Sequence, residues 1–239
     1  MFMEFPDIII LAGGLGTRLK DEIPDLPKPM APVNGRPFLE YLLNYIDSFG
    51  FRKVILSTGY LGNVIMDHFR ERYKGLQLEY SVEDKPLGTG GAIKLAVEKV
   101  KTHYFIVMNG DTFFNINLQR FFQINIENLA KMSIALREVD NASRYGQIDM
   151  NNQGIITGFH EKSDNDKPGL INGGTYILNT KYFRKFDLPA VFSFEKDWLQ
   201  KYAFTEEFRG QIFNDYFLDI GIPEDYKKAQ DELKAFENR

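Results

Sequence analysis

The first half of the chain alternates short apolar runs with longer segments whose apolar residues recur every three or four positions. The apolar run at 7–12 is rich in β-branched residues and predicts a buried strand. The segment that Pro37 opens and Gly50 closes has helical spacing and predicts a helix. This alternation continues to residue 108 and is typical of right-handed βαβ units around a mainly parallel sheet.

The same patterns predict the other elements. In the first half we expect strands at 53–58, 76–82 and 104–108 and helices at 60–73 and 90–100. The second half is less regular, with strands expected at 132–137, 146–150, 155–160 and 175–178, a polar loop at 163–169 and an amphipathic helix over 223–239. We therefore predict one α/β domain in which residues 1–112 bind a nucleotide and residues 113–239 shape a second pocket.

Composition and charge exclude several classes of protein. The chain has 239 residues and a formal charge of −4 with no long basic run, which disfavours nucleic-acid binding. The absence of cysteine excludes disulfides, thiolate metal sites and thiol catalysis. Residues 1–6 lack a signal-peptide pattern, and no apolar stretch approaches about 20 residues, so we expect a cytoplasmic protein that does not bind membranes.

A glycine-rich segment, LAGGLGTRL at 11–19, follows the first predicted strand directly. Gly13, Gly14 and Gly16 permit a tight turn whose bare N–H groups can approach an anion. Arg18 adds a planar, permanently charged side chain that can hold two phosphate oxygens. The segment matches neither a P-loop nor a dinucleotide fingerprint. It predicts a phosphate-binding turn, and an ordinary strand-to-helix turn is the alternative.

Two further segments carry candidate nucleotide-binding residues. Lys28 lies between two prolines, which stiffen the backbone and would aim its amine; an exposed lysine in an extended loop is the alternative. Residues 83–92, EDKPLGTGGA, form a second glycine-rich junction. An ionised Glu83 only accepts hydrogen bonds, so it suits guanine, with its adjacent N1–H and amine donors, better than thymine or uracil. A plain helix start capped by Thr89 is the alternative.

Two aspartates are candidate metal ligands. Asp111 follows a predicted buried strand and Gly110, and Asp219 lies far downstream in the segment LDIG. Paired carboxylates at the carboxyl ends of such strands are typical of Mg²⁺ sites, where phosphate oxygens and water complete the coordination. Either aspartate alone is also common in turns and caps. The sequence does not by itself bring the two together.

The second half offers polar groups for a sugar phosphate. Glu161 can accept hydrogen bonds from hydroxyls, and the adjacent Lys162 can pair with a phosphate. Asn172 can both donate to and accept from hydroxyls, and Gly173 would let a ring approach the backbone. Separately these residues are also typical of a solvated ion pair and a bulged strand. Together they favour a sugar-phosphate site.

The order of these motifs resembles that of the sugar-1-phosphate nucleotidyltransferases over nearly the whole chain: GGLGTRL, PKPM, EDKPLGTGGA, NGD, EK, NGG and LDIG. The resemblance implies a Rossmann-like three-layer sandwich with a mixed, mainly parallel central sheet. It also implies Mg²⁺ dependence and attack of a sugar 1-phosphate on the α-phosphorus of a nucleoside triphosphate. Larger members append a hexapeptide-repeat β-helix, which this sequence lacks.

The resemblance also implies a role for each motif residue. Arg18, Lys28, Asp111 and Lys162 would be catalytic, and Asp111 and Asp219 would bind Mg²⁺. The nucleotide would contact Leu11, Ala12, Gly13, Gly14, Gly16, Thr17, Arg18, Glu83, Pro86, Gly88, Thr89, Asn109 and Gly110. The sugar phosphate would contact Gly146, Glu161, Lys162, Asn172 and Gly173.

Within this family, the short length, the string PLGTGGAIK and Glu83 most resemble enzymes that transfer a guanylyl group from GTP to D-glycero-α-D-manno-heptose 1-phosphate. Mannose 1-phosphate guanylyltransferases share the glutamate and the string PLGT. The expected partners are therefore GTP and a sugar 1-phosphate, without nucleic acid or membrane. The sequence leaves a homo-oligomer open.

Three rival functions belong to other classes. A sugar-nucleotide sensor could lose Lys28, Asp111 and Lys162, all of which are present. A glycosyltransferase normally carries an Asp-x-Asp metal motif after a strand, whereas residues 164–166 lie in a polar loop. A phosphocholine or other alcohol-phosphate cytidylyltransferase is the closest enzymatic competitor, and an aromatic cage for choline, which sequence cannot show, would distinguish it.

Overall fold

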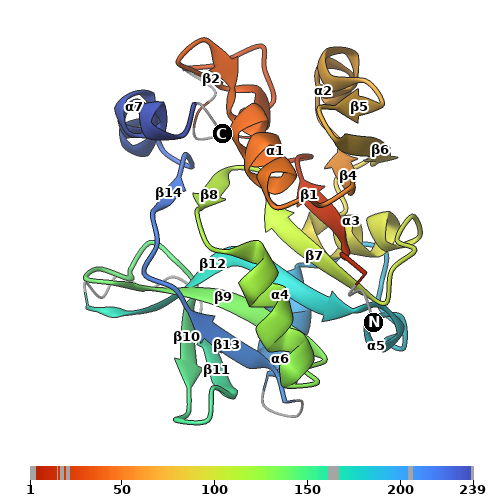
Figure 1. Cartoon of the computed structure of the whole chain (residues 1–239), viewed down its shortest axis with the longest axis vertical. Helices are drawn as coiled ribbons and strands as arrows, with labels where there is room; N and C mark the ends of the chain where they lie inside the picture. Colours follow the sequence, from red (N-terminus) through yellow and green to blue (C-terminus); the bar gives the residue numbers. More distant parts are fainter. Residues whose placement is uncertain are drawn as a thin grey trace.

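The protein is described here from a computed structural model that covers residues 4–14, 16, 19, 22–160, 167–203 and 207–237 (Figure 1). The strands of the first half are β1 (Asp7–Leu11), β2 (Pro32–Val33), β3 (Arg36–Pro37), β4 (Lys53–Thr58), β5 (Arg72–Tyr73), β6 (Leu76–Val82) and β7 (Tyr104–Asn109). Those of the second half are β8 (Thr112–Phe114), β9 (Met132–Val139), β10 (Gln147–Met150), β11 (Ile156–His160), β12 (Gly169–Asn179), β13 (Arg209–Ile212) and β14 (Phe217–Asp219).

The helical segments lie between these strands. The α-helices are α1 (Phe38–Ser48), α2 (Gly62–Phe69), α3 (Gly88–Val97), α4 (Leu118–Glu127), α5 (Thr180–Phe183), α6 (Gln200–Tyr202) and α7 (Pro223–Glu232). The 3-10 helices are η2 (Lys28–Met30) and η4 (Leu233–Phe236), and η3 (Phe194–Leu199) is a π-helix.

Ten strands form one mixed sheet. Its main path runs β11-β10-β12-β7-β1-β4-β6-β5, while β9 pairs with both β12 and β13. The central strands β7, β1, β4 and β6 are parallel, because helices carry the chain back between them. The long strand β12 pairs antiparallel with β7 and extends the sheet into the second half. The expected α/β fold with a mixed, mainly parallel central sheet is confirmed.

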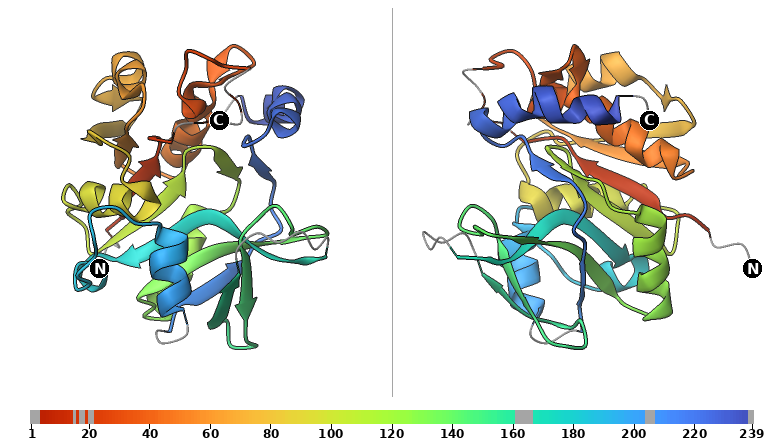
Figure 2. Two further views of the ribbon diagram at one scale, coloured as in Figure 1. Left: turned by 180° about the vertical axis from the view of Figure 1, so that it is seen from behind. Right: turned by 60° about the vertical axis from the view of Figure 1, so that its left-hand side comes forward.

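Helices cover both faces of this sheet, as a three-layer sandwich requires. Alternate residues of β1 point to opposite faces, so Ile8 and Ile10 belong to one apolar cluster and Ile9 to another. The first cluster includes side chains of α1, α2, α4 and α7, and the second includes those of α3, α5 and η3. Figure 1 looks onto the face with α1 and α4, and the reverse view in Figure 2 shows the η3–α6 segment in front.

The structure corrects several predicted boundaries. The helix expected at 60–73 stops at Phe69 because Arg70 takes a left-handed conformation with φ of 53°, and β5 then pairs with β6. The strand expected at 175–178 begins at Gly169, within the predicted polar loop. The last helix ends at Glu232 and continues only as η4. Helix α4 was not predicted, although Asn117 caps it and its buried residues Leu118, Phe121, Phe122 and Asn125 recur at helical spacing.

No helix within the described ranges has both the length and the apolar character needed to cross a membrane.

Candidate active site

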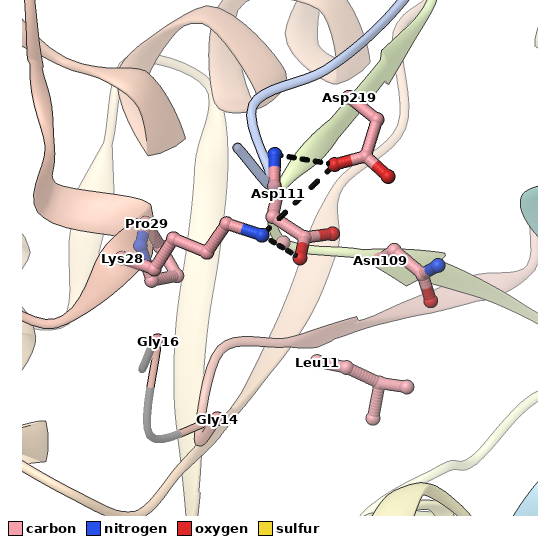
Figure 3. A pocket seen from close by; sticks show the side chains of 10 residues that line it. Leu11, Gly14, Gly16, Lys28, Pro29, Asn109, Asp111 and Asp219 are labelled. Atoms are coloured by element: carbon pink, nitrogen blue, oxygen red, sulfur yellow. Dashed lines mark hydrogen bonds and ion pairs between the residues drawn. The ribbon is translucent and has the colours of Figure 1, made fainter. Parts of the chain in front are cut away.

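A cavity of about 380 Å³ lies at the carboxyl ends of β1 and β7, where an open α/β sheet places its ligands. We call it the Lys28 cavity. It is lined by Leu11, Gly14, Gly16, Lys28, Pro29, Asn109, Gly110, Asp111, Asp219 and Gly221 (Figure 3). Eight of these residues had been predicted from the sequence as site residues; Pro29 and Gly221 belong to the same motifs.

Lys28 lies between two carboxylates in this cavity. Its Nζ is 2.5 Å from Asp111 Oδ2 and 3.9 Å from Asp219 Oδ1 (Figure 3). The short helix η2, which contains Pro29, holds the lysine, and only 13% of its side chain is exposed. The two carboxylates carry one more negative charge than the ammonium group neutralises. This excess negative charge, provided by oxygen atoms alone, is what a divalent cation prefers.

The two aspartates meet because β14 returns to the edge of β8. The two strands pair antiparallel, with Asp219 opposite Thr112, the residue that follows Asp111. The backbone N–H of Gly221 donates to Asp219 Oδ1 at 2.6 Å and fixes the carboxylate. The structure therefore brings together two residues whose meeting the sequence left open. The described residues contain no cluster of three or more acidic, histidine or cysteine side chains, so a cation here would need phosphate and water as further ligands.

A second cavity, of about 210 Å³, joins the two glycine-rich segments. We call it the Glu83 cavity. It is lined by Leu11, Gly13, Gly14, Ser57, Glu83, Pro86, Gly88, Thr89 and Ala92. Glu83 Oε2 accepts from the backbone N–H of Leu87 at 3.0 Å, and Oε1 accepts weakly from the Ser57 hydroxyl at 3.5 Å. Burial raises the pKa of Glu83, and these two donors partly offset the rise.

Gly13 shows why one segment must be glycine-rich. A Cβ atom at this position would lie 2.8 Å from Glu83 Oε1 and 3.1 Å from the backbone nitrogen of Gly59. The absence of a side chain therefore lets the first turn pack directly against the carboxylate of the second.

A third cavity, of about 250 Å³, lies on the side of the second half. We call it the Tyr176 cavity. It is lined by Asn109, Thr112, Tyr145, Gly146, Phe159, Asn172, Tyr176, Ser193, Glu195, Lys196, Phe217 and Asp219. Asn172 Nδ2 donates to the Tyr176 hydroxyl at 2.6 Å, and burial followed by the charge of Glu195 raises the pKa of Tyr176 well above its usual value.

The three cavities lie next to one another in a row. Leu11 and Gly14 line both the Glu83 cavity and the Lys28 cavity, and Asn109 and Asp219 line both the Lys28 cavity and the Tyr176 cavity. The carboxylates and Lys28 are therefore in the middle of the row. One long ligand, or two ligands that react with each other, would meet at that point.

The remaining predicted residues fall into two groups. Thr17, Arg18, Glu161 and Lys162 lie outside the described residues. Ala12 and Gly173 line none of the three cavities: Ala12 is buried, and a Cβ on Gly173 would meet the Phe114 ring at 2.6 Å. Gly173 therefore serves close packing between β12 and β8.

Sequence reasoning missed several side chains that line the row. They are Ser57, Tyr145, Phe159, Tyr176, Ser193, Glu195, Lys196 and Phe217. Ser193 caps η3, a common pattern at helix starts that carries no functional signal, and nothing in the sequence predicts a π-helix there. A π-helix is often found at functional sites, so the structure supplies the missing signal.

Comparison with known proteins identifies the family. The pattern of the family described as Nucleotidyl transferase matches residues 7–235. A D-glycero-alpha-D-manno-heptose 1-phosphate guanylyltransferase of Aneurinibacillus thermoaerophilus is 44% identical over 230 residues, which are 96% of this chain and 99% of that protein. The protein of the same name from Campylobacter jejuni is 45% identical over 218 residues, 91% of this chain and 96% of that protein.

A solved structure agrees with the fold as well. The crystal structure of HddC from Yersinia pseudotuberculosis superimposes with a TM-score of 0.86 at 39% identity, and the match covers 96% of this chain and 100% of that one. The same protein complexed with GMP-PN gives a TM-score of 0.85. Because the family pattern spans residues 7–235 and the Aneurinibacillus relative is 44% identical over 96% of this chain, the chain belongs to the nucleotidyl transferase family.

Proposed function

We propose that this enzyme transfers a guanylyl group from GTP to D-glycero-α-D-manno-heptose 1-phosphate and releases pyrophosphate. The observation that carries the proposal is the row of three adjacent cavities with Lys28, Asp111 and Asp219 in the middle. In this arrangement the base occupies the Glu83 cavity, the phosphates the Lys28 cavity and the sugar the Tyr176 cavity.

The base is guanine because the Glu83 cavity presents a carboxylate. A guanine edge carries two adjacent donors, and an ionised carboxylate only accepts. The Yersinia structure with GMP-PN supports a guanine nucleotide for this chain, since that protein is 39% identical to it. The heptose is supported by the names of the Aneurinibacillus and Campylobacter relatives.

The reaction is an in-line displacement at the α-phosphorus. A phosphate oxygen of the sugar 1-phosphate forms the new P–O bond, and the bond to the bridging oxygen of the leaving pyrophosphate breaks. The nucleophile is already an anion at neutral pH, so no side chain has to remove a proton. Rate enhancement then comes from positioning and from charge stabilisation.

Lys28 supplies part of that charge stabilisation. Its ammonium group lies in the middle cavity and would neutralise charge that accumulates on the phosphates. Asp111 and Asp219 are the residues that would hold Mg²⁺, and the pair of oxygen donors fits that ion. When bound, Mg²⁺ supplies further positive charge to the phosphate oxygens. Arg18 and Lys162 are proposed as additional phosphate ligands on the strength of their motifs.

A pyrophosphate-release screen tests the proposal. Purified enzyme with Mg²⁺ is offered GTP, ATP, CTP, UTP and dTTP against a panel of heptose and hexose 1-phosphates. We expect the highest kcat/KM for GTP with the heptose 1-phosphate. A preference for mannose 1-phosphate would correct the sugar, since a Mycobacterium tuberculosis mannose-1-phosphate guanylyltransferase is 30% identical over 230 residues. Pyrophosphate release from GTP that does not depend on any sugar 1-phosphate would overturn the proposal.

A further inference from the structure

One hydrogen bond joins the walls of two cavities. Thr89, in the first turn of α3, lines the Glu83 cavity, and Glu195, at the start of η3, lines the Tyr176 cavity. Thr89 Oγ1 donates to Glu195 Oε2 at 2.6 Å, although 106 residues separate them in the chain. The hydroxyl proton of Thr89 is therefore committed to Glu195, even though Thr89 lies beside the proposed base site.

The backbone holds this contact in place. The N–H of Phe194 donates to Thr89 Oγ1 at 2.9 Å, so the hydroxyl both gives and receives a hydrogen bond. The carbonyl of Phe192 accepts from Gly90 N at 3.0 Å and from Gly91 N at 3.3 Å. These bonds tie the chain before η3 to the start of α3. Glu195 is thus held by a rigid segment before any ligand arrives.

The carboxylate of Glu195 has acceptor capacity to spare. Ser193 Oγ donates to Oε2 at 3.1 Å, the same oxygen that accepts from Thr89. A carboxylate offers about four acceptor positions, and these two donors occupy only part of them. The remaining positions can serve a ligand in the Tyr176 cavity. Tyr145, Phe159 and Phe217 give that cavity apolar walls against which the faces of a sugar ring can lie.

From this geometry, and resting on the proposed function, we infer that Glu195 accepts a hydrogen bond from a hydroxyl of the sugar 1-phosphate. Thr89 is the positioning residue that orients this carboxylate. Glu195 thereby determines specificity for a polyhydroxylated substrate, and it does so through a contact that also fixes the first turn of α3.

The variant Glu195→Gln tests this inference through separate KM values. Its amide oxygen can still accept from Thr89, but its amide nitrogen is a donor where the sugar hydroxyl needs an acceptor. We expect KM for the sugar 1-phosphate to rise about tenfold or more, as for the loss of a hydrogen bond to a charged group. KM for GTP and the melting temperature should stay near their wild-type values.

The matched control is Asp197→Asn. Asp197 is exposed on the same π-helix, accepts from the Ser193 N–H at 2.7 Å and lines none of the three cavities. Asparagine keeps that acceptor, so both KM values should be unchanged. Thr89→Val should raise KM for the sugar 1-phosphate by a smaller factor than Glu195→Gln, because the carboxylate remains but is no longer oriented.

Deoxy analogues of the sugar 1-phosphate separate recognition from a purely structural role. Removing the hydroxyl that Glu195 binds should cost the wild-type enzyme the factor that Glu195→Gln costs, and should cost the variant nothing further. If every deoxy analogue raised KM by the same factor in wild type and in Glu195→Gln, the inference would be overturned. It would also be overturned if Glu195→Gln raised KM for both substrates and lowered the melting temperature. Wild-type inactivity toward the whole sugar panel would instead overturn the proposed function, and with it this assignment.

Discussion

At the scale of single residues, Lys28 pairs with the same two carboxylates that are the candidate ligands of a divalent cation. In the structure its ammonium group is the cation beside Asp111 and Asp219. A divalent cation bound by these aspartates would compete with Lys28 for the negative charge and would release the lysine toward the phosphates.

The variant Lys28→Met should separate these two roles. Methionine keeps the apolar stem and removes the charge, so Mg²⁺ should bind the substrate-free variant several-fold more tightly, as measured by calorimetric titration. Turnover should fall on the order of 100-fold, because a charge-stabilising group is lost. The control is Lys53→Met, which breaks an ion pair of 3.0 Å with Glu79 on β6 and should change neither quantity. Unchanged or weaker Mg²⁺ binding by Lys28→Met would contradict the competition.

Glu83 affects both the stability of the protein and its choice of nucleotide. Burial raises its pKa above the usual 4.5, so the folded protein holds this proton more tightly than the unfolded chain does. The resulting stability is complete below pH 4.5 and is lost as pH rises through the raised pKa. At neutral pH the ionised, partly buried carboxylate therefore lowers the free energy of unfolding.

Glu83→Gln should consequently melt at a higher temperature than wild type at pH 7, and the difference should shrink near pH 4. The same variant should show a higher KM for GTP and a smaller change for UTP or dTTP. Asp84→Asn is the control, because the adjacent Asp84 is exposed and lines none of the cavities. If Glu83→Gln had the same KM values for GTP, UTP and dTTP as wild type, Glu83 would not be the residue that recognises the base.

At the scale of elements, a tie between the segment before β10 and α7 shapes the Tyr176 cavity. Arg144 donates to Asp225 at 2.5 Å, and Asp225 is buried in the first turn of α7, where it also contacts Lys228. Tyr145 follows Arg144 directly and lines the cavity. Helix α7 in turn follows β14, which carries Asp219. The contact between Arg144 and Asp225 thus links the wall of the Tyr176 cavity to the segment that carries Asp219.

Breaking this tie with Arg144→Gln should raise KM for the sugar 1-phosphate several-fold and affect KM for GTP less. Because nearly half of the arginine side chain is exposed, the loss of folding stability should be small. A double-mutant cycle with Asp225→Asn, measured by chemical unfolding, should give a coupling energy of about 1 kcal/mol. Additive effects of the two variants would show that the contact does not act as a tie.

At the scale of the whole molecule, the two halves share one sheet and both cores. Strand β12 of the second half pairs with β7 of the first along Thr175–Asn179. The apolar cluster on one face joins Ile8 of β1 to Leu218 of β14, and the cluster on the other joins Ile9 to Trp198 of η3. We propose that residues 1–112 and 113–239 are halves of one cooperative unit.

Calorimetry should then record a single unfolding transition for the whole chain, with equal calorimetric and van't Hoff enthalpies. The isolated segment 1–112 should not unfold cooperatively, because its β7 edge and both cluster faces would be uncovered. Two resolved transitions in the whole chain would contradict the proposal and assign each half its own core.

The alternation of apolar and polar residues was sufficient for most of the first half. The strands at 53–58 and 76–82 were predicted with their observed bounds. The first contains a buried apolar run, and the second alternates apolar with polar residues, and both patterns are typical of strands. The end of α2 was wrong because a left-handed Arg70 leaves no trace in periodicity. The π-helix η3 was missed because tertiary packing, rather than local propensity, determines it. Helix α4 was missed although its apolar residues recur at helical spacing.

The sequence by itself supplied the candidate residues of the site. The two glycine-rich turns, Lys28, Glu83 and the two aspartates are residue types that suit phosphate, a base and a metal ion, although each of them alone also has an ordinary structural explanation. Only the tertiary structure decided that Asp111 and Asp219 meet on either side of Lys28, and that Thr89 donates a hydrogen bond to Glu195. The reason is physical: local sequence governs backbone conformation, whereas contacts across 106 residues depend on how strands and helices pack.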